Sequence, residues 1–321
     1  MPQFDLPLSE LRAYRPDVAE PADFDEFWQR TLDESRAAGG EVTLEPMHAL
    51  PGVEIFDMTF PGFGGQPIKA WYSRPANTSA ALPVVVQFHG YGGGRGLPFE
   101  HTFWPSAGYA HVMMDNRGQG SSWGNGGDTP DVGSTGPSLP GEMTRGIERP
   151  QDYYYRRLFT DAVRCVESAR TIEGVDASQT FVVGGSQGGA MTLAVAGLVP
   201  DLAAVMPDVP FMCNFERAIY ITDADPFGEL RRYFAIHRDN SEQAFRTLSY
   251  FDCVNFAKRA SARALFSVGL FDEICPPSTV FAAYNWYAGD KDITVYDFNG
   301  HEGGAGHQGV KQWELVRNLT R

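Results

Sequence analysis

Residues 181–190, Phe-Val-Val-Gly-Gly-Ser-Gln-Gly-Gly-Ala, decide the fold of this chain. The β-branched and aromatic run at 181–183 is typical of a buried parallel strand, and the small and apolar residues from Gln187 onward predict a helix. Ser186 therefore lies at a strand-to-helix turn, between Gly184 and Gly188. In this context the G-x-S-x-G pattern predicts a nucleophile, because the glycines permit a sharp turn that exposes the hydroxyl. A turn that only packs the helix against the strand is the alternative.

The composition is that of a large globular protein. The chain has 321 residues, of which 43% are hydrophobic, and a net charge of −14. This length suits one α/β domain with insertions as well as two domains. The acidic excess argues against binding nucleic acid or anionic membranes, because both require a clustered positive field. The cysteines show no metal-ligand spacing and are expected to be free thiols: Cys165, Cys213, Cys253 and Cys275.

The N-terminal segment has neither the basic region nor the apolar core of a signal peptide. No apolar run approaches the about 20 residues of a membrane span, so we expect a cytoplasmic protein without a membrane partner. Residues 1–50 are expected to extend a single domain that covers residues 1–321. Within this extension Phe24, Phe27 and Trp28 predict one apolar helix face, and Asp23 is placed to cap that helix.

The loop after the strand predicted at 82–88 contains a second candidate for binding an oxyanion. Its sequence, His89-Gly-Tyr-Gly-Gly-Gly94, resembles the glycine-rich HGGG loop of esterases, and we assign the backbone N–H of Tyr91 as a donor. The N–H of Gln187, at the start of the new helix, is the other donor. His89 is expected to be structural. Arg117, after the next strand, is expected to form a structural ion pair.

The remaining chain continues the alternation of strands and helices, with two interruptions. Residues 120–146 are rich in Gly, Ser, Thr and Pro and too long for an ordinary connection, so this insertion is expected to be functional or to contact a partner. Residues 216–255 are expected to form a mostly helical cap over the serine that helps to select the acyl group. Strands are also predicted at 53–59, 67–74, 109–115, 202–206, 264–271 and 293–298, and helices at 151–172 and 277–287.

Two further residues complete a nucleophile–base–acid arrangement. Asp272 and His301 each follow a predicted strand, and Ser186, Asp272 and His301 occur in the order of the α/β-hydrolase triad. Their side chains should meet at the carboxyl edge of one parallel sheet. A serine hydroxyl needs a neutral imidazole to take its proton, and the carboxylate orients that imidazole. Glu273 and Asp290 are the alternative acids, and a helix-capping or ion-pairing Asp272 is the non-catalytic alternative.

The chain resembles the acetyl xylan esterase and cephalosporin-C deacetylase family, carbohydrate esterase family seven, nearly from end to end. The resemblance rests on HGYGG, RGQG, GGSQGG, SVGLFDEICPP and HEGG, together with FDLPLSEL at the start. It implies an α/β-hydrolase fold with a mostly parallel sheet and helices on both faces. It also implies Ser186 as nucleophile, Asp272 as acid and His301 as base, with Tyr91 and Gln187 as oxyanion donors. Asn214 departs from the histidine that family members often carry.

The resemblance further implies a substrate class and an assembly. It implies deacetylation of small acetylated sugars and of cephalosporin C, without metal or organic cofactor. It implies homohexamers in which the insertion makes contacts and the active sites face an inner cavity. The residues implied to line a small acyl pocket are Tyr91, Phe211, Pro226, Ile274 and Cys275. A carboxylesterase or lipase of other specificity, a peptidase on the same fold and a non-catalytic binding protein are the rival interpretations.

Overall fold

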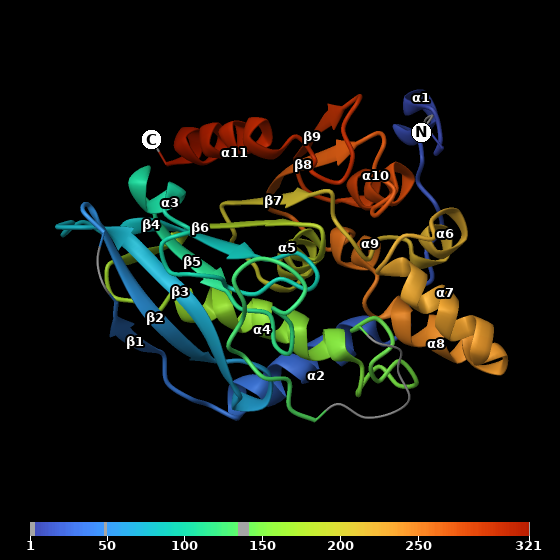
Figure 1. Cartoon of the computed structure of the whole chain (residues 1–321), viewed down its shortest axis with the longest axis horizontal. Coiled ribbons are helices and arrows are strands. Elements are labelled where there is room, and N and C mark those ends of the chain that lie inside the picture. Colours follow the sequence, from blue (N-terminus) through green and yellow to red (C-terminus); the bar gives the residue numbers. More distant parts are fainter. Residues whose placement is uncertain (1–3, 48–49, 134–140, 321) are drawn as a thin grey trace.

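A single nine-stranded sheet organises the described part of the chain. The computed structural model describes residues 4–47, 50–133 and 141–320. The strand order is β1-β2-β3-β5-β4-β6-β7-β8-β9 (Figure 1). The first three strands and the β3–β5 pair are antiparallel, and every pair from β5 to β9 is parallel. The strands are β1 Thr43–Pro46, β2 Val53–Pro61, β3 Pro67–Pro75, β4 Leu82–Phe88, β5 Ala110–Met114, β6 Val175–Gly185, β7 Ala204–Asp208, β8 Arg263–Gly269 and β9 Lys291–Tyr296.

Helices cover both faces of the sheet because successive side chains of its strands point to opposite faces. In β4, Val84 and Val86 join the larger core, whereas Val85 joins a second core with Val316 of the last helix. Figure 1 shows α3 and α11 on one side of the sheet and α2 and α4 on the other. The helices are α1 Leu8–Leu11, α2 Phe24–Ala37, α3 Phe103–Ser106, α4 Tyr154–Ala169, α5 Gln187–Leu198, α6 Phe215–Ile221, α7 Phe227–Ile236, α8 Ser241–Ser249, α9 Cys253–Ala257, α10 Pro277–Trp286 and α11 Ala305–Leu319, with 3₁₀ turns at Phe63–Gly65 and Arg238–Asn240.

Most predicted elements are present close to their predicted bounds. The strand at 82–88 is confirmed to the residue, and the hairpin of β2 and β3 is confirmed. In contrast, Asp23 does not cap α2: no side-chain cap bond is formed there, and its carboxylate accepts a hydrogen bond of 2.6 Å from the Tyr250 hydroxyl. The predicted helix cap was wrong because Tyr250, which lies 227 positions away in the sequence, binds the Asp23 carboxylate that was expected to accept a backbone N–H of α2.

Arg117 forms the structural ion pair that its sequence context predicted. Its guanidinium donates to both carboxylate oxygens of Asp161 in α4, at 2.5 and 2.7 Å, and also to Gln66. Both members of the pair are fully buried. The main-chain oxygen of Arg117 accepts from the Tyr154 hydroxyl, so the pair fastens the loop after β5 to α4. The four cysteines are free thiols, as expected, and all four are buried.

The two interruptions of the α/β pattern flank one end of the parallel strands. The cap predicted at 216–255 contains α6, α7, α8 and α9. Of the predicted insertion at 120–146, residues 134–140 lie outside the described residues, and residues 120–133 and 141–146 contain neither helix nor strand. Within the described ranges, none of the helices has the length and hydropathy needed to traverse a lipid bilayer.

Candidate active site

Ser186 occupies a strained turn between β6 and α5. Its φ of 57° and ψ of −119° are rare for a residue with a side chain, and such strain is typical of a nucleophile elbow. The turn is held from two sides. The N–H of Ser186 donates to the Asp208 carbonyl oxygen at 3.0 Å, and the Ser186 carbonyl oxygen accepts from the N–H of Phe211 at 3.0 Å. These bonds tie the turn to the end of β7, so the elbow is anchored rather than free to relax.

The two motif glycines are required by close backbone contacts. A Cβ at Gly184 would lie 2.4 Å from the Gly188 carbonyl oxygen, and a Cβ at Gly188 would lie 2.3 Å from the Phe88 carbonyl oxygen. Both distances are far below normal contact, and both neighbours are backbone atoms. The second contact presses the start of α5 against the end of β4, where the predicted oxyanion loop begins. The glycines therefore bring two chain segments together at the serine.

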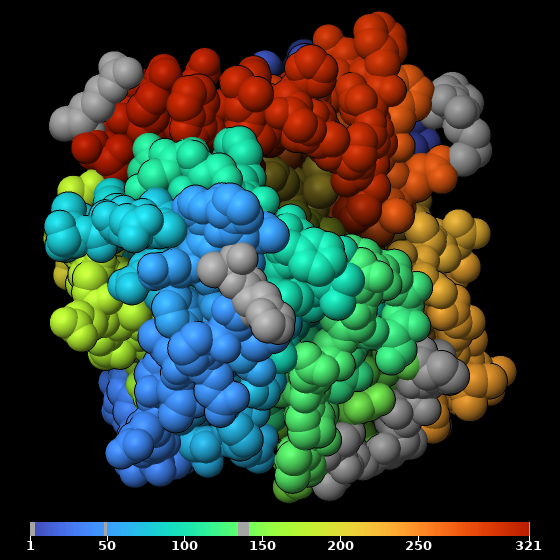
Figure 2. All heavy atoms as spheres, turned by 60° about the vertical axis from the view of Figure 1, so that its left-hand side comes forward, coloured from blue at the N-terminus to red at the C-terminus, as the bar shows by residue number. Residues whose placement is uncertain are grey.

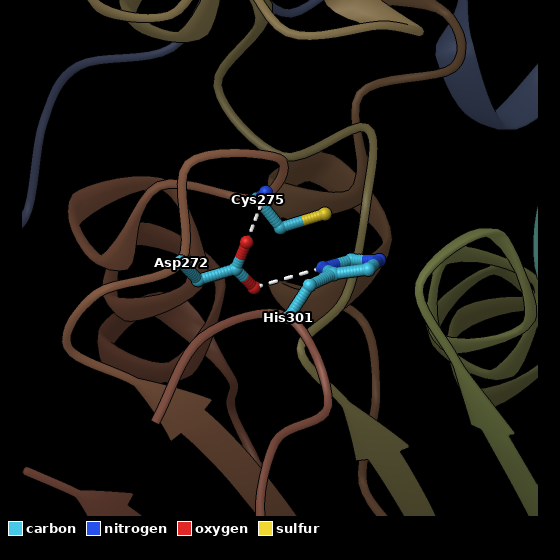
Figure 3. A group of neighbouring side chains, drawn as sticks. All are labelled: Asp272, Cys275 and His301. Atoms are coloured by element: carbon cyan, nitrogen blue, oxygen red, sulfur yellow. Dashed lines mark hydrogen bonds and ion pairs between the residues drawn. The ribbon is translucent and has the colours of Figure 1, made fainter. Parts of the chain in front are cut away.

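Asp272 and His301 are hydrogen-bonded to one another. Asp272 follows β8 and His301 follows β9, and Nδ1 of His301 lies 2.9 Å from Oδ2 of Asp272 (Figure 3). The other oxygen, Oδ1, accepts the N–H groups of Ile274 and Cys275 at 2.9 Å each. Because an ionised carboxylate only accepts, this hydrogen bond selects the neutral imidazole tautomer that has its proton on Nδ1 and its lone pair on Nε2. This is the tautomer that a general base requires.

Ser186 and His301 line the same cavity. Within the described part of the chain, the Ser186 hydroxyl makes no hydrogen bond to the imidazole, a contact that often tightens only when substrate binds. Cys275 lies three residues after Asp272, and its thiol is the other candidate nucleophile near the triad. Burial, followed by the Asp272 charge, raises the pKa of this thiol well above its usual range. Cys275 therefore stays protonated and is a poor rival nucleophile.

The predicted oxyanion donors are both available. Gln187 is the first residue of α5, so its N–H has no intrahelical acceptor. No hydrogen bond among the described residues uses the N–H of Tyr91, although its carbonyl oxygen accepts from Trp123 Nε1 at 2.7 Å. Their assignment as oxyanion donors stays a prediction.

The side chain of Gln119 links the two candidate donors. Its Oε1 accepts the N–H of Gly92 at 2.7 Å, next to Tyr91, and its Nε2 donates to Oε1 of Gln187 at 2.9 Å. The Tyr154 hydroxyl lies 2.9 Å from the same Nε2, and the Tyr155 hydroxyl donates to Gln187 at 3.1 Å. Sequence reasoning quoted Gln119 within the RGQG motif without assigning it a role. The structure places it as the connection between the loop after β4 and the start of α5.

The cavity at the serine has a volume of about 530 Å³, within the range of small-molecule sites. Figure 2 shows a hollow between the red C-terminal segments and the teal and green segments near residues 100–125. Residues from both interruptions and from three strand ends form the wall. The lining residues are Gln87, Phe88, His89, Gly90, Tyr91, Trp123, Gly185, Ser186, Asp208, Val209, Asp225, Pro226, Ile274, His301 and Glu302. A cavity of similar volume at Arg164 and Glu167 contains no comparable catalytic group.

The predicted acyl-pocket residues fall into two groups. Tyr91, Pro226 and Ile274 line the cavity, whereas Phe211 and Cys275 are fully buried and are not among its lining residues. The ring of Phe211 packs against Phe227 of α7, with 4.4 Å between the ring centroids. The contact of all five residues with substrate stays a prediction.

Asn214 and His89, which were also identified from the sequence, make contacts typical of residues with a structural role. Asn214 begins α6 and donates to the Tyr14 hydroxyl at 3.2 Å. His89 stands against His101 and Trp123, and burial, followed by His101, lowers its pKa to about 4. His89 is therefore neutral near pH 7, in line with a structural rather than an acid–base role.

Asp272, Cys275 and His301 also have the spacing of a possible cation site, since one ligand atom of each lies within 4.8 Å of the others. In the arrangement of Figure 3, the Asp272 oxygens are already occupied by His301 and by two backbone N–H groups. A cation here would compete with the hydrogen bond that orients the imidazole. The donor set therefore fits the triad better than a resident metal.

Asp208 is a half-buried acid beside the serine that sequence reasoning missed. It ends β7; its Oδ2 accepts from Gln312 of α11 at 2.5 Å, and its Oδ1 is enclosed without a hydrogen-bond partner. Burial raises the pKa of this carboxyl to about 7. No pattern in the sequence separates it from an ordinary strand-end aspartate.

This shift predicts a specific pH dependence of stability. The folded pKa of Asp208 exceeds the unfolded value of about 4, so its contribution is complete below that value and is lost as pH rises to about 7. We expect Asp208→Asn, which mimics the protonated acid, to gain stability over the wild type by about 1.4 kcal/mol per pH unit across this interval. Urea unfolding between pH 4.5 and 8 measures the difference. Exposed Asp297→Asn is the control, and a difference independent of pH would contradict the prediction.

The fold and the site together define an α/β-hydrolase: a mostly parallel sheet that places a serine elbow, an acid and a histidine at its carboxyl edge. Comparison with known proteins narrows this class. The acetyl xylan esterase (AXE1) family model matches residues 1–319. The chain belongs to this family, whose members are carboxylic ester hydrolases.

Two solved structures agree with this chain over nearly its whole length. An acetyl xylan esterase from Paenibacillus sp. R4 is 38% identical with a TM-score of 0.91, and the match covers 97% of this chain and 99% of that one. Acetyl xylan esterase 1 from Thermoanaerobacterium sp. JW/SL YS485 is 35% identical with a TM-score of 0.92, covering 99% and 100%. Acetyl esterase Axe7A of Xylanibacter ruminicola is 25% identical over 298 residues, which are 89% of this chain but only 65% of that relative's length. The predicted family and fold class are therefore confirmed.

Proposed function

We propose that this chain removes acetyl groups from small acetylated sugars, such as xylo-oligosaccharides and peracetylated monosaccharides, and from cephalosporin C. The observation that carries the proposal is the 2.9 Å bond between Asp272 and Nδ1 of His301, at a cavity that Ser186 also lines. Similarity to two acetyl xylan esterases along the whole chain supports the acetyl group as the acyl part.

The proposed mechanism transfers the acetyl group in two steps. Oγ of Ser186 attacks the acetyl carbonyl carbon while its proton passes to Nε2 of His301. The N–H groups of Tyr91 and Gln187 stabilise the oxyanion, each by on the order of 3 kcal/mol. The intermediate collapses, and His301 returns the proton to the departing sugar oxygen. Water then attacks acetyl-Ser186 with the same proton transfers, and acetate leaves.

Acetate release from peracetylated glucose, peracetylated xylobiose and cephalosporin C tests the proposal, with Ser186→Ala as the blank. Release from all three is expected for a broad deacetylase. Release from none would refute the proposed function. A series of p-nitrophenyl esters from acetate to octanoate separates this activity from that of a lipase. We expect the rate to fall steeply with chain length, and a preference for octanoate would contradict the small acyl pocket.

We also propose that the chain assembles into a homohexamer and acts in the cytoplasm. The basis is the family resemblance, in which the insertion at 120–146 contacts neighbouring subunits and the active sites face an inner cavity. In such an assembly small acetylated sugars reach Ser186 but polymeric xylan does not. Light scattering should then give six times the mass of the chain.

A further inference from the structure

The phenol of Tyr91 is held by two segments that are distant in sequence. Its hydroxyl donates to Oε1 of Glu229 in α7 at 2.8 Å. The same hydroxyl accepts the backbone N–H of Glu142, in the second described part of the insertion, residues 141–146. Tyr91 therefore joins the loop after β4 to the cap and to the insertion.

Glu229 closes the same junction with its second oxygen. Oε2 accepts the N–H of Met143 at 3.2 Å, so one carboxylate binds both Tyr91 and the insertion. Gly141 approaches it so closely that a Cβ there would lie 2.1 Å from Oε1. Residues 141–143 of the insertion therefore pack closely against this carboxylate.

Burial of the Glu229 carboxylate lowers the stability of the fold. Glu229 is buried, and the nearby Arg232 forms its ion pair with Asp225 instead. Burial raises the pKa of Glu229 to about 7, which reflects the penalty for its charge. A buried acid without a paired cation destabilises the fold, and such groups concentrate at functional sites. The two hydrogen bonds that Glu229 accepts, from Tyr91 and from Met143, indicate what its function is.

The backbone on both sides of Tyr91 is also hydrogen-bonded. The Gly90 carbonyl oxygen accepts the N–H of Gly93 at 3.2 Å and the side-chain amide of Asn116 at 3.3 Å, and the N–H of Gly92 donates to Gln119. The Tyr91 carbonyl oxygen accepts from Trp123, whereas no hydrogen bond among the described residues uses the Tyr91 N–H. The anchored phenol adds a restraint from the cap to a loop whose backbone already leaves this N–H free for a ligand.

We propose that Glu229 is a positioning residue for the oxyanion hole: by anchoring the Tyr91 hydroxyl from α7, it fixes the direction of the Tyr91 N–H toward the developing oxyanion. This inference rests on the proposed function, since it assumes that Tyr91 donates to the intermediate. It assigns the cap a part in transition-state stabilisation in addition to acyl selection.

The test compares Tyr91→Phe, Glu229→Gln and the double variant. Tyr91→Phe removes only the hydroxyl and keeps the ring. Glu229→Gln keeps the shape but presents an N–H₂ group where one of the two donors now binds. We expect kcat for p-nitrophenyl acetate to fall about tenfold in each, less than the about 10²-fold typical of deleting a donor outright. KM should change less than about twofold, because ground-state binding is not altered.

The double variant should lose no more than either single variant, since both break one interaction. Binding of methaneboronic acid, which forms a tetrahedral adduct on a serine, should weaken in the same proportion as kcat. Glu242→Gln is the matched control: Glu242 lies on α8 of the same cap, is exposed and does not line the cavity at the serine, so kcat should stay at the wild-type value.

Wild-type kcat in Tyr91→Phe would overturn the proposal, as would additive losses in the double variant or an equal loss in Glu242→Gln. A rise in KM with unchanged kcat would likewise overturn it. If Glu229→Gln does not fold, Tyr91→Phe alone decides through kcat and boronate affinity. Failure of the proposed function is separate, because it would show as a wild-type protein that releases no acetate, or as full activity in Ser186→Ala.

Discussion

Ser186→Ala is expected to lower kcat for p-nitrophenyl acetate by about 10⁴-fold or more, since removal of a triad serine leaves only binding and oxyanion stabilisation. The hydroxyl is the atom that becomes acylated, and its nearest alternative, the Cys275 thiol, is held protonated by burial. The substitution should not destabilise the fold, because the elbow is held by backbone bonds of Ser186 to Asp208 and Phe211.

The comparison requires a matched serine away from the site. Ser178→Ala serves this purpose, because Ser178 is exposed and its hydroxyl only contacts Asp176. Initial rates and thermal unfolding should be recorded for both variants. Ser178→Ala should match the wild type in both. Activity of Ser186→Ala within about tenfold of the wild type would exclude Ser186 as the nucleophile.

Asp272→Asn is expected to reduce kcat by about 10³–10⁴-fold with a small change in KM, as when the tautomer of a triad histidine is inverted. The reason is specific to this site. The N–H groups of Ile274 and Cys275 both point at Oδ1, so the amide oxygen of an asparagine will take that position. Its N–H₂ group must then face Nδ1 of His301, which turns Nδ1 into an acceptor and places the proton on Nε2. The imidazole can no longer accept the serine proton.

The alternative acids from the sequence provide the controls. Asp290 is exposed and pairs with Arg263, so Asp290→Asn should retain wild-type kcat. Glu273→Gln should do the same, since Asp272 already occupies Nδ1 of His301. A large loss in either control together with an active Asp272→Asn would reassign the acid.

The elements predicted best were those whose signals are local. The strand at 82–88 was predicted to the residue, because a short run of β-branched valines is typical of a strand that is buried on both faces of a parallel sheet. The elbow was predicted because Gly184 and Gly188 are needed within a few residues of Ser186. In contrast, β1 at Thr43–Pro46 was missed, since a four-residue, largely exposed edge strand has no alternating pattern to detect.

Elements that depend on distant partners escaped sequence reasoning. Asp23 has every local property of a helix cap, yet Tyr250 takes its carboxylate. Glu229 lies on a short amphipathic helix, where a glutamate usually faces solvent. Only the packing of α7 against the loop after β4 buries it beside Tyr91, which is 138 positions away.

The sequence by itself determined the alternation of strands and helices, the elbow and the order of Ser186, Asp272 and His301. These depend on residue period and on turns, which neighbouring residues control. The tertiary structure alone decided which acid bonds to His301, which polar groups are buried at the cavity, and how Gln119 and Glu229 hold the two candidate oxyanion donors. Burial and hydrogen-bond geometry arise where segments far apart in the chain meet, so no local pattern encodes them.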